Sequence, residues 1–190
     1  MVFKLNVIVA STRPSRAGLP IAKWAFEHIA RHDAFESRFV DLAVVNLPFL
    51  DEPAHPRLRT YLHQHTKDWS AAIEWADAFV VVTPEYNYGM PAPLVNALDF
   101  LYHEWAYKPI GFVSYGGIAG GTRSVQMARL MVTSLRMVSI PEGVQIPFFS
   151  PHLKEGVFTG TEAHVKSLGG MLGELARWTS ALAALRAPSQ

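Results

Sequence analysis

The stretch Thr83-Pro84-Glu85-Tyr86-Asn87-Tyr88-Gly89-Met90-Pro91 decides the fold. It directly follows Ala78-Phe79-Val80-Val81-Val82, a β-branched apolar run typical of a strand that is buried on both faces. Apolar residues then recur at helical spacing from Leu94 to Leu101. The stretch is therefore a strand-to-helix crossing, and its two tyrosines, asparagine and two prolines exceed what a plain turn needs. We expect it to form the rim of a pocket for a flat ligand.

Strands and helices alternate along the rest of the chain. Strands are expected at residues 5–9, 39–45, 78–82, 109–114 and within 137–149, and helices at 19–29, 69–76, 94–101, 124–135 and 165–182. This alternation predicts βαβ units, a parallel sheet and helices on both of its faces. Five strands suit a flavodoxin-like three-layer α/β sandwich with the strand order 2-1-3-4-5. In that order, ligands bind at the carboxyl ends of strands one, three and four, which here precede three unusual loops.

Length and composition limit the possible functions. A chain of 190 residues, 49% of them hydrophobic, predicts one domain spanning residues 1–190. The formal net charge of +1 gives no reason to expect a nucleic-acid partner. The absence of cysteine excludes disulfides, thiolate nucleophiles and cysteine-ligated metals, and it favours a cytoplasmic location. Neither a signal peptide nor an apolar run of membrane-spanning length is visible, so no membrane association is expected.

The first loop, residues 10–18, combines hydroxyl groups with arginines. Ser11, Thr12 and Ser15 offer hydroxyls, Arg13 and Arg16 offer guanidinium groups, and a helix begins directly afterwards. Helix N-termini attract anions and arginine binds phosphate bidentately, so the loop is a candidate phosphate site. The alternative is a polar turn with two solvated arginines. Neither the P-loop motif nor Gly-x-Gly-x-x-Gly is present, so a bound phosphate would belong to a mononucleotide.

The second loop is the opening stretch itself. Tyr86 or Tyr88 could lie against a planar ring, Pro84 could pack on it, and the backbone N–H groups of residues 85–87 could reach ring heteroatoms. Alternatively, both tyrosines are ordinary core or interface aromatics.

The third loop, residues 115–121, contains two pairs of glycines. Glycine allows the backbone to approach a ligand closely, so N–H groups here could bond the carbonyl edge of a ring. The alternative is a glycine-rich start of a helix. The three loops together predict a ligand site more strongly than any one of them does, because all three lie at one edge of the predicted sheet.

Other polar pairs are weaker candidates. His63 and His65 lack a third ligand, so a solvated helix start is a better interpretation than a metal site. Asp51 and Glu52 are adjacent, which favours solvated side chains over a shared site. We therefore expect no metal and no protein side chain acting as a catalytic acid or base.

At this point the sequence resembles a known family. Ser11-Thr12-Arg13-Pro14-x-Arg16, Pro84-Glu85-Tyr86-Asn87 and Tyr115-Gly116-Gly117-x-x-Gly120-Gly121-x-Arg123 look like motifs of the NADPH-dependent FMN reductase family. Residues 50–53 and 90–99 are similar too. The resemblance covers most of the chain and thins after Leu135.

The resemblance implies a flavodoxin-like fold that holds FMN without a covalent bond. It implies a ping-pong reductase that takes hydride from NADPH or NADH and passes it to quinones, azo dyes, free flavin or metal oxyanions. It also implies a homodimer or a dimer of dimers, in which the partner subunit supplies the loop around residues 51–56.

The matched motifs assign roles to individual residues. Ser11, Arg13 and Arg16 would hold the phosphate, Pro84 to Asn87 would line the isoalloxazine, and Tyr115 to Gly117 would meet its pyrimidine side. The full set of candidate cofactor-binding residues is Ser11, Arg13, Ser15, Arg16, Pro84, Glu85, Tyr86, Asn87, Ser114, Tyr115, Gly116 and Gly117. The substrate platform, meaning the surface on which donor and acceptor would lie, comprises Tyr86, Tyr88, Gly120 and Arg123.

Ala10 and Ser15 depart from the family pattern, which often has glycine at both positions. Ser15 could either crowd the phosphate or add a hydroxyl to it. Three other functions stay open: a one-electron carrier of the flavodoxin type, a flavin-binding redox sensor, and an α/β domain without flavin. Carriers of that type are usually acidic, and this chain is balanced in charge.

Overall fold

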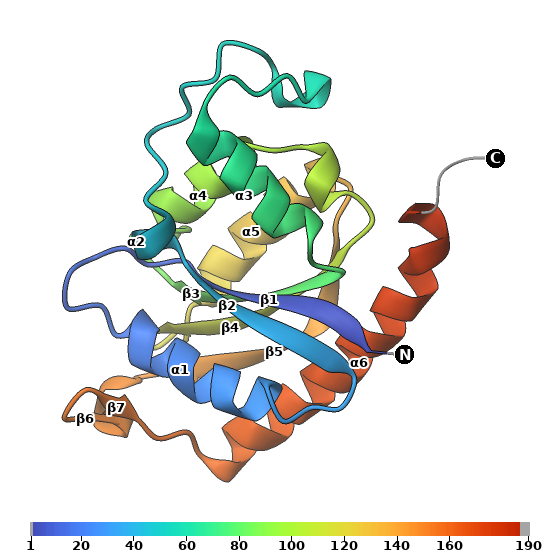
Figure 1. The fold of residues 1–190 in the computed structure, drawn as a ribbon. Coiled ribbons are helices and arrows are strands. Elements are labelled where there is room, and N and C mark those ends of the chain that lie inside the picture. The colour runs from blue at the N-terminus through green and yellow to red at the C-terminus, as the bar shows by residue number, and fades with distance from the viewer. Residues whose placement is uncertain (1, 187–190) are drawn as a thin grey trace.

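A five-stranded parallel sheet forms the middle layer of the computed structural model, which describes residues 2–186. Its strand order is β2-β1-β3-β4-β5, and every neighbouring pair is parallel (Figure 1). The strands are β1 (Phe3–Val9), β2 (Phe35–Asp41), β3 (Ala78–Pro84), β4 (Pro109–Gly116) and β5 (Val138–Pro147). This order confirms the predicted flavodoxin-like architecture.

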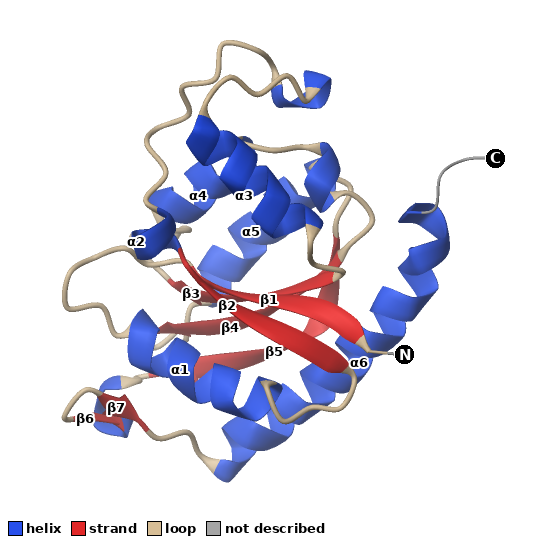
Figure 2. Cartoon of the chain, in the orientation of Figure 1, coloured by secondary structure: helices blue, strands red, loops and turns tan. Residues whose placement is uncertain are grey.

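Helices cover both faces of the sheet. Figures 1 and 2 show α1 and α6 on one face and α3, α4 and α5 on the other. The helices are α1 (Gly18–Ile29), α2 (Leu42–Val45), α3 (Gln64–Glu74), α4 (Ala92–Asp99), α5 (Thr122–Ser134) and α6 (Glu162–Arg186). Single turns of 3₁₀ helix lie at Pro56–Leu58, His103–Trp105 and Ser150–His152, and a small hairpin joins β6 (Leu153–Lys154) to β7 (Val157–Phe158).

The core is divided by the sheet because successive side chains of a strand point to opposite faces. In β3, Val80 and Val82 pack toward α1 and α6, whereas Phe79 and Val81 pack toward α3, α4 and α5. Every residue of β3 is buried, as its uninterrupted apolar sequence predicts.

The second strand lies earlier than expected. The sequence predicted it at residues 39–45, but β2 is Phe35–Asp41 and Leu42–Val45 form the short helix α2. The Asp41 carboxylate accepts a hydrogen bond from the Ala43 N–H and so caps this helix. β2 is an edge strand with one buried residue, Phe35, so it lacks the continuous apolar run on which the prediction relied. The β6–β7 hairpin was not predicted.

The strand register places the three unusual loops together. Val9 of β1 lies beside Val82 of β3, and Val82 lies beside Val113 of β4. The three strands therefore end at about the same level, and the loops that follow them share one edge of the sheet. This arrangement is the one that the sequence predicted.

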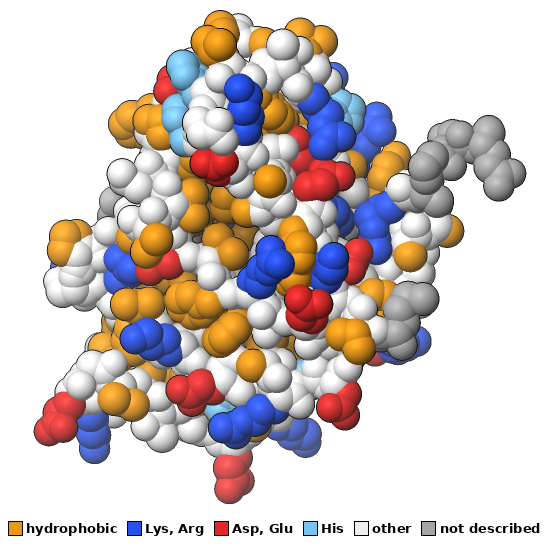
Figure 3. All heavy atoms as spheres, in the orientation of Figure 1, with side chains coloured by type: hydrophobic (Ala, Val, Ile, Leu, Met, Phe, Trp, Pro, Cys, Tyr) orange, Lys and Arg blue, Asp and Glu red, His pale blue; other side chains and the backbone are white. Residues whose placement is uncertain are grey.

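The surface in Figure 3 carries charges of both signs. Acidic and basic side chains alternate over this face, and hydrophobic side chains gather in a recess below the upper helices. Among the described helices, none has both the length and the apolar character that crossing a bilayer requires.

Candidate active site

The first loop ends at an open helix N-terminus. The N-cap residue of α1, Ala17, makes no side-chain capping hydrogen bond. Within residues 2–186, no hydrogen bond is made by the backbone N–H groups of residues 11–13 and 15–17. Arg13 and Ser15 are exposed beside them. Unsatisfied N–H groups, a helix dipole and a nearby arginine together form a site for an anion.

Arg16 is held in place by a carboxylate at the end of β2. Its Nη2 pairs with Asp41 Oδ2, and its buried Nε has no hydrogen-bond partner in the described part of the chain. Asp41 was not singled out in the sequence, because the predicted strand placed it in the middle of an element. A guanidinium that is oriented by an ion pair and retains an unused donor is well suited to binding an oxyanion.

The second loop contains a tight turn with strained backbone. Tyr86 and Gly89 exchange backbone hydrogen bonds of 3.0 and 2.9 Å, and the two residues between them have positive φ, 50° at Asn87 and 67° at Tyr88. Two central residues of positive φ define a type I′ turn. Positive φ is uncommon for tyrosine and marks sites where the surrounding structure imposes it.

This turn changes which backbone donors remain available. The Glu85 N–H donates to the Tyr115 carbonyl at 3.3 Å, and the Tyr86 N–H donates to Gly89. From the sequence, both N–H groups were predicted to be possible hydrogen-bond donors to a bound ring. Of residues 85–87, only the Asn87 N–H has no partner among the described residues.

Glu85, Arg123 and Tyr88 form a connected unit at the start of α5. Glu85 accepts from the Arg123 backbone N–H at 3.0 Å and from its guanidinium at 2.7 Å. The guanidinium carbon lies 4.2 Å from the centroid of the Tyr88 ring. The unit thus holds the exposed Tyr88 ring beside the Arg123 guanidinium.

The glycines of the third loop have different reasons to be glycine. Gly121 has φ of 84°, and a Cβ there would lie 2.7 Å from the Tyr115 nitrogen, so its role is internal. Gly117 is exposed, and a Cβ there would meet nothing within 4 Å. Its N–H also lacks a partner in the described residues. Gly117 therefore leaves open space and a free donor at the surface of the third loop.

Ser114 supports the third loop from below. Its side chain is buried, and its hydroxyl donates to the Gly120 carbonyl at 2.8 Å. The hydroxyl is therefore engaged inside the protein. The Tyr115 side chain is also buried, on the α1 side of the sheet.

Three hydroxyl groups meet where the first and second loops approach each other. The Ser11 and Tyr86 hydroxyls lie 2.8 Å apart, and Tyr115 is their neighbour. Burial raises the pKa of the Tyr115 phenol and Tyr86 raises it further, whereas Ser11 and Arg16 lower it. The structure thus directs Tyr86 toward the first loop and Tyr88 toward Arg123, although the sequence had placed both on one platform.

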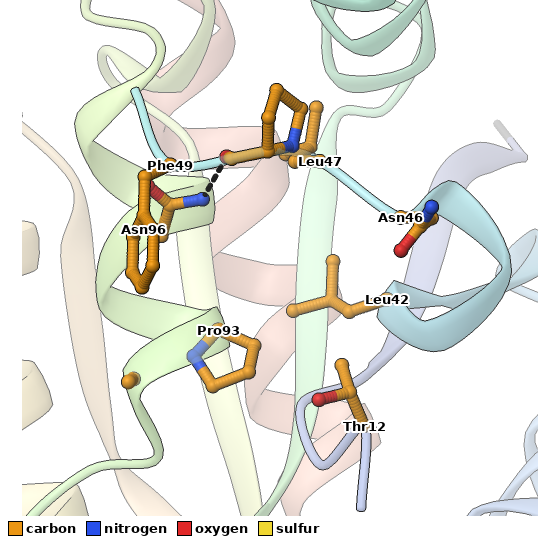
Figure 4. Close-up of a pocket in the computed structure, with 9 residues that line it drawn as sticks. Thr12, Leu42, Asn46, Leu47, Phe49, Pro93 and Asn96 are labelled. Carbon is orange, nitrogen blue, oxygen red and sulfur yellow. Dashed lines mark hydrogen bonds between the residues drawn. The ribbon is translucent and has the colours of Figure 1, made fainter. Parts of the chain in front are cut away.

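A hollow of about 320 Å³ adjoins the first loop (Figure 4). Figure 4 shows Leu42 and Pro93 on opposite sides of it, with Asn96 holding the segment above through the Pro48 carbonyl at 2.7 Å. It is lined by Thr12, Leu42, Asn46, Leu47, Pro48, Phe49, Ala92, Pro93 and Asn96. Most of these residues were missed. The resemblance of residues 90–99 to the family was the one signal that pointed to Asn96.

The pairs at residues 51–52 and 63–65 contact each other at the start of α3. Glu52 accepts from the backbone N–H groups of Leu62 and His63 at 2.8 and 3.0 Å, and Asp51 lies 2.9 Å from His65. Asp51 is exposed, as expected, and Glu52 is half-buried, and both carboxylates also tie the loop to the helix. No group of three or more potential metal ligands occurs within residues 2–186.

Comparison with known proteins identifies the group to which this site belongs. A sequence model of the NADPH-dependent FMN reductase family matches residues 3–150. The chain belongs to this family. An NAD(P)H-dependent FMN reductase of Schizosaccharomyces pombe is 39% identical over 168 residues, covering 87% of this chain and 84% of the relative. An FMN-dependent NADPH-azoreductase of Staphylococcus aureus is 27% identical over 136 residues, covering 71% and 72%.

Family membership confirms the resemblance, the oxidoreductase class, and FMN with NAD(P)H as the cofactor and co-substrate. The match continues past Leu135 to residue 150. Among solved structures, the flavoenzyme FerB, an NAD(P)H:acceptor oxidoreductase of Paracoccus denitrificans, has a TM-score of 0.74 at 22% identity. The aligned region covers 95% of this chain and 98% of FerB, which supports the shared fold.

The residues present fit FMN. The uncapped start of α1 and the unpartnered Arg16 Nε suit a phosphate, and the space beside Gly117 suits the close approach of a ring. These features leave room for an anion at the start of α1 and for a flat ring beside Gly117.

Proposed function

We propose that this FMN reductase transfers hydride from NADPH or NADH, through bound FMN, to quinone, azo, flavin or metal-oxyanion acceptors in a ping-pong cycle. The observation that carries the proposal is the open N-terminus of α1, where six backbone N–H groups, those of residues 11–13 and 15–17, have no partner in the described chain. FMN supplies the hydride chemistry when bound, and the protein binds and orients it.

Phosphate binding rests on Ser11, Arg13, Ser15 and Arg16. The departure at Ala10 is harmless, because Ala10 is buried and its N–H donates to the Val82 carbonyl at 3.0 Å. Ser15 is exposed, so its hydroxyl can turn toward a phosphate without displacing the core.

Ring binding rests on the free N–H groups of Asn87 and Gly117, with Pro84 and Gly116 beside them. Donors at these positions would stabilise negative charge on the pyrimidine side of a bound, reduced ring. Glu85 and Ser114 act indirectly. Glu85 holds the start of α5 in place, and Ser114 holds the third loop.

The substrate platform is formed by Tyr88 and Arg123, next to Gly120. Arg123 is paired with Glu85, so its charge is largely compensated. An additional cation would be needed to bind the 2′-phosphate that distinguishes NADPH from NADH. Lys108 is a candidate by charge, but it is buried and donates to the Ile73 and Glu74 carbonyls. Lys108 is therefore engaged inside the protein, and we propose that the site accepts both NADPH and NADH.

Assembly as a homodimer or dimer of dimers is part of the proposal. Phe49 at the hollow, Tyr88 and Ile118 on the candidate loops, and Leu130 farther along α5 are large apolar side chains that are mostly exposed, and a partner subunit would cover such groups. The cysteine-free sequence supports a cytoplasmic location, and one flavin-binding domain spanning residues 1–190 completes the proposal.

Anaerobic titration of the FMN-loaded protein with NADPH, followed at the visible flavin band, tests the function. We expect rapid bleaching and recovery of the band on adding a quinone. A band that persists would identify a carrier or sensor, and failure to take up FMN would contradict the assigned cofactor. Sedimentation analysis in the same buffer tests the assembly.

A further inference from the structure

The contact between Tyr86 and Ser11 joins two loops that lie far apart in the sequence. Their hydroxyl oxygens are 2.8 Å apart although the residues are separated by 75 positions. Ser11 is fully buried, whereas Tyr86 is 38% exposed. The phenol thus reaches from the loop after β3 to the loop after β1, and part of its surface remains exposed.

We propose that Tyr86 binds the phosphate of FMN through its hydroxyl and makes the site select FMN over riboflavin. This inference rests on the proposed function, because it takes Ser11 as a phosphate residue. It changes the role of Tyr86 from a ring-stacking residue to a specificity-determining residue at the phosphate end.

The number of hydroxyl protons supports this role. Ser11 and Tyr86 carry one hydroxyl proton each, and their mutual hydrogen bond uses one of them. The second proton is available to an acceptor. An oxyanion that reaches the Tyr86 oxygen also lies close to Ser11, so one of the two hydroxyls can donate to it while the other donates to its neighbour.

The surrounding charges favour an anion at this point. Arg16 lies close enough to influence the neighbouring Tyr115 phenol, and the one carboxylate at Arg16, Asp41, is already paired with it. The open start of α1 adds its unsatisfied N–H groups. A neutral ribityl hydroxyl would gain much less from this environment than a phosphate dianion.

The neighbouring tyrosine shows why Tyr86 is not needed as a platform. Tyr88 is 74% exposed, and its ring is held beside Arg123. The type I′ turn between the two residues directs one phenol inward and the other outward. Tyr88 therefore already supplies the exposed aromatic ring of the proposed platform.

Binding of FMN and riboflavin to the wild type and to Tyr86→Phe, measured by quenching of flavin fluorescence, tests the inference. Phenylalanine keeps the ring and removes the hydroxyl. We expect the Kd for FMN to rise roughly tenfold, the size of one lost hydrogen bond to a charged group, while the Kd for riboflavin stays the same. Tyr107→Phe is the matched control, because it removes a phenol hydroxyl before β4, at the opposite end of the sheet, and should change neither Kd.

The double variant Ser11→Ala/Tyr86→Phe sharpens the test. If both hydroxyls bind one phosphate, the two single effects on the FMN Kd will not add. Equal weakening of FMN and riboflavin by Tyr86→Phe, or no change in either, overturns the inference while the proposed function stands. A wild-type protein that binds neither flavin contradicts the proposed function itself.

Discussion

The starts of helices α1 and α5 lie on the same edge of the sheet but are completed differently. The first turn of α5 is closed by the chain itself, since Glu85 accepts from the Arg123 N–H at 3.0 Å. The start of α1 has no such group: its N-cap is Ala17, and its first turn contains no acidic residue.

This difference separates scaffold from binding site. A helix N-terminus carries partial positive charge and unsatisfied donors, and a carboxylate is the usual means of satisfying them. At α5 the carboxylate belongs to the protein. At α1 the chain supplies arginines and hydroxyls instead, which leaves the place of the anion to a ligand.

The largest expected effect on stability concerns Gly121, the N-cap residue of α5. Gly121→Ala places a Cβ at φ of 84°, 2.7 Å from the Tyr115 nitrogen and 2.8 Å from the Ser114 Cβ. We expect the free energy of unfolding in urea to fall by about 2–4 kcal/mol, from left-handed strain and overpacking.

Gly117→Ala is the matched control for this variant. A Cβ there meets nothing within 4 Å, so stability should change by less than about 0.5 kcal/mol. A large loss of stability at Gly117, or none at Gly121, would contradict the division between a closed scaffold and an open pocket edge.

Arg13→Ala tests the open end. Arg13 is exposed and no ion pair or hydrogen bond of its side chain occurs within residues 2–186, so stability should hardly change. Loss of a charge-assisted contact should raise the Kd for FMN roughly 10- to 100-fold. Arg31→Ala, just beyond the other end of α1, is the control and should leave FMN binding unchanged. An unaltered FMN affinity in Arg13→Ala would remove Arg13 from the phosphate site.

Glu85→Ala opens the closed end. It removes the acceptor for the Arg123 N–H, and we expect a loss of about 1–2 kcal/mol in the free energy of unfolding, as for other lost caps. Arg123→Ala keeps that hydrogen bond and removes only an ion pair whose arginine side chain is 44% exposed, so it should cost about 0.5 kcal/mol. Equal costs in the two variants would show that the ion pair, rather than the cap, holds α5.

The architecture was predictable from the sequence because local patterns encode it. The buried strand at Ala78–Pro84 and the alternation of strands and helices led to the observed order 2-1-3-4-5. The edge strand β2 was misplaced, because a strand with one buried residue carries a weak apolar signal and the run that follows it is helical.

The composition of the site was predictable, but its internal pairing was not. Sequence spacing identified the three loops, yet it could not show that Arg16 pairs with Asp41, that Glu85 caps α5, or that Tyr86 reaches Ser11. Each of these contacts joins residues at least 25 positions apart, so the folded register of the strands decides them.

The C-terminus of α3 is a third helix end, and the chain closes it with a cation. Lys108 donates to the Ile73 and Glu74 carbonyls at the C-terminus of α3, and burial lowers its pKa from 10.5 to about 8. Between these two pH values the unfolded lysine keeps a proton that the folded one has lost, so the unfolded state binds more protons. The contribution of Lys108 to stability should therefore rise with pH from about 8 to 10.5 and stay constant below that window. The check is the difference in urea unfolding free energy between the wild type and Lys108→Met across this range, because the methionine variant lacks the titration. A difference that does not change with pH would show that the lysine keeps its charge when folded, with the α3 carbonyls stabilising the cation as firmly as water does.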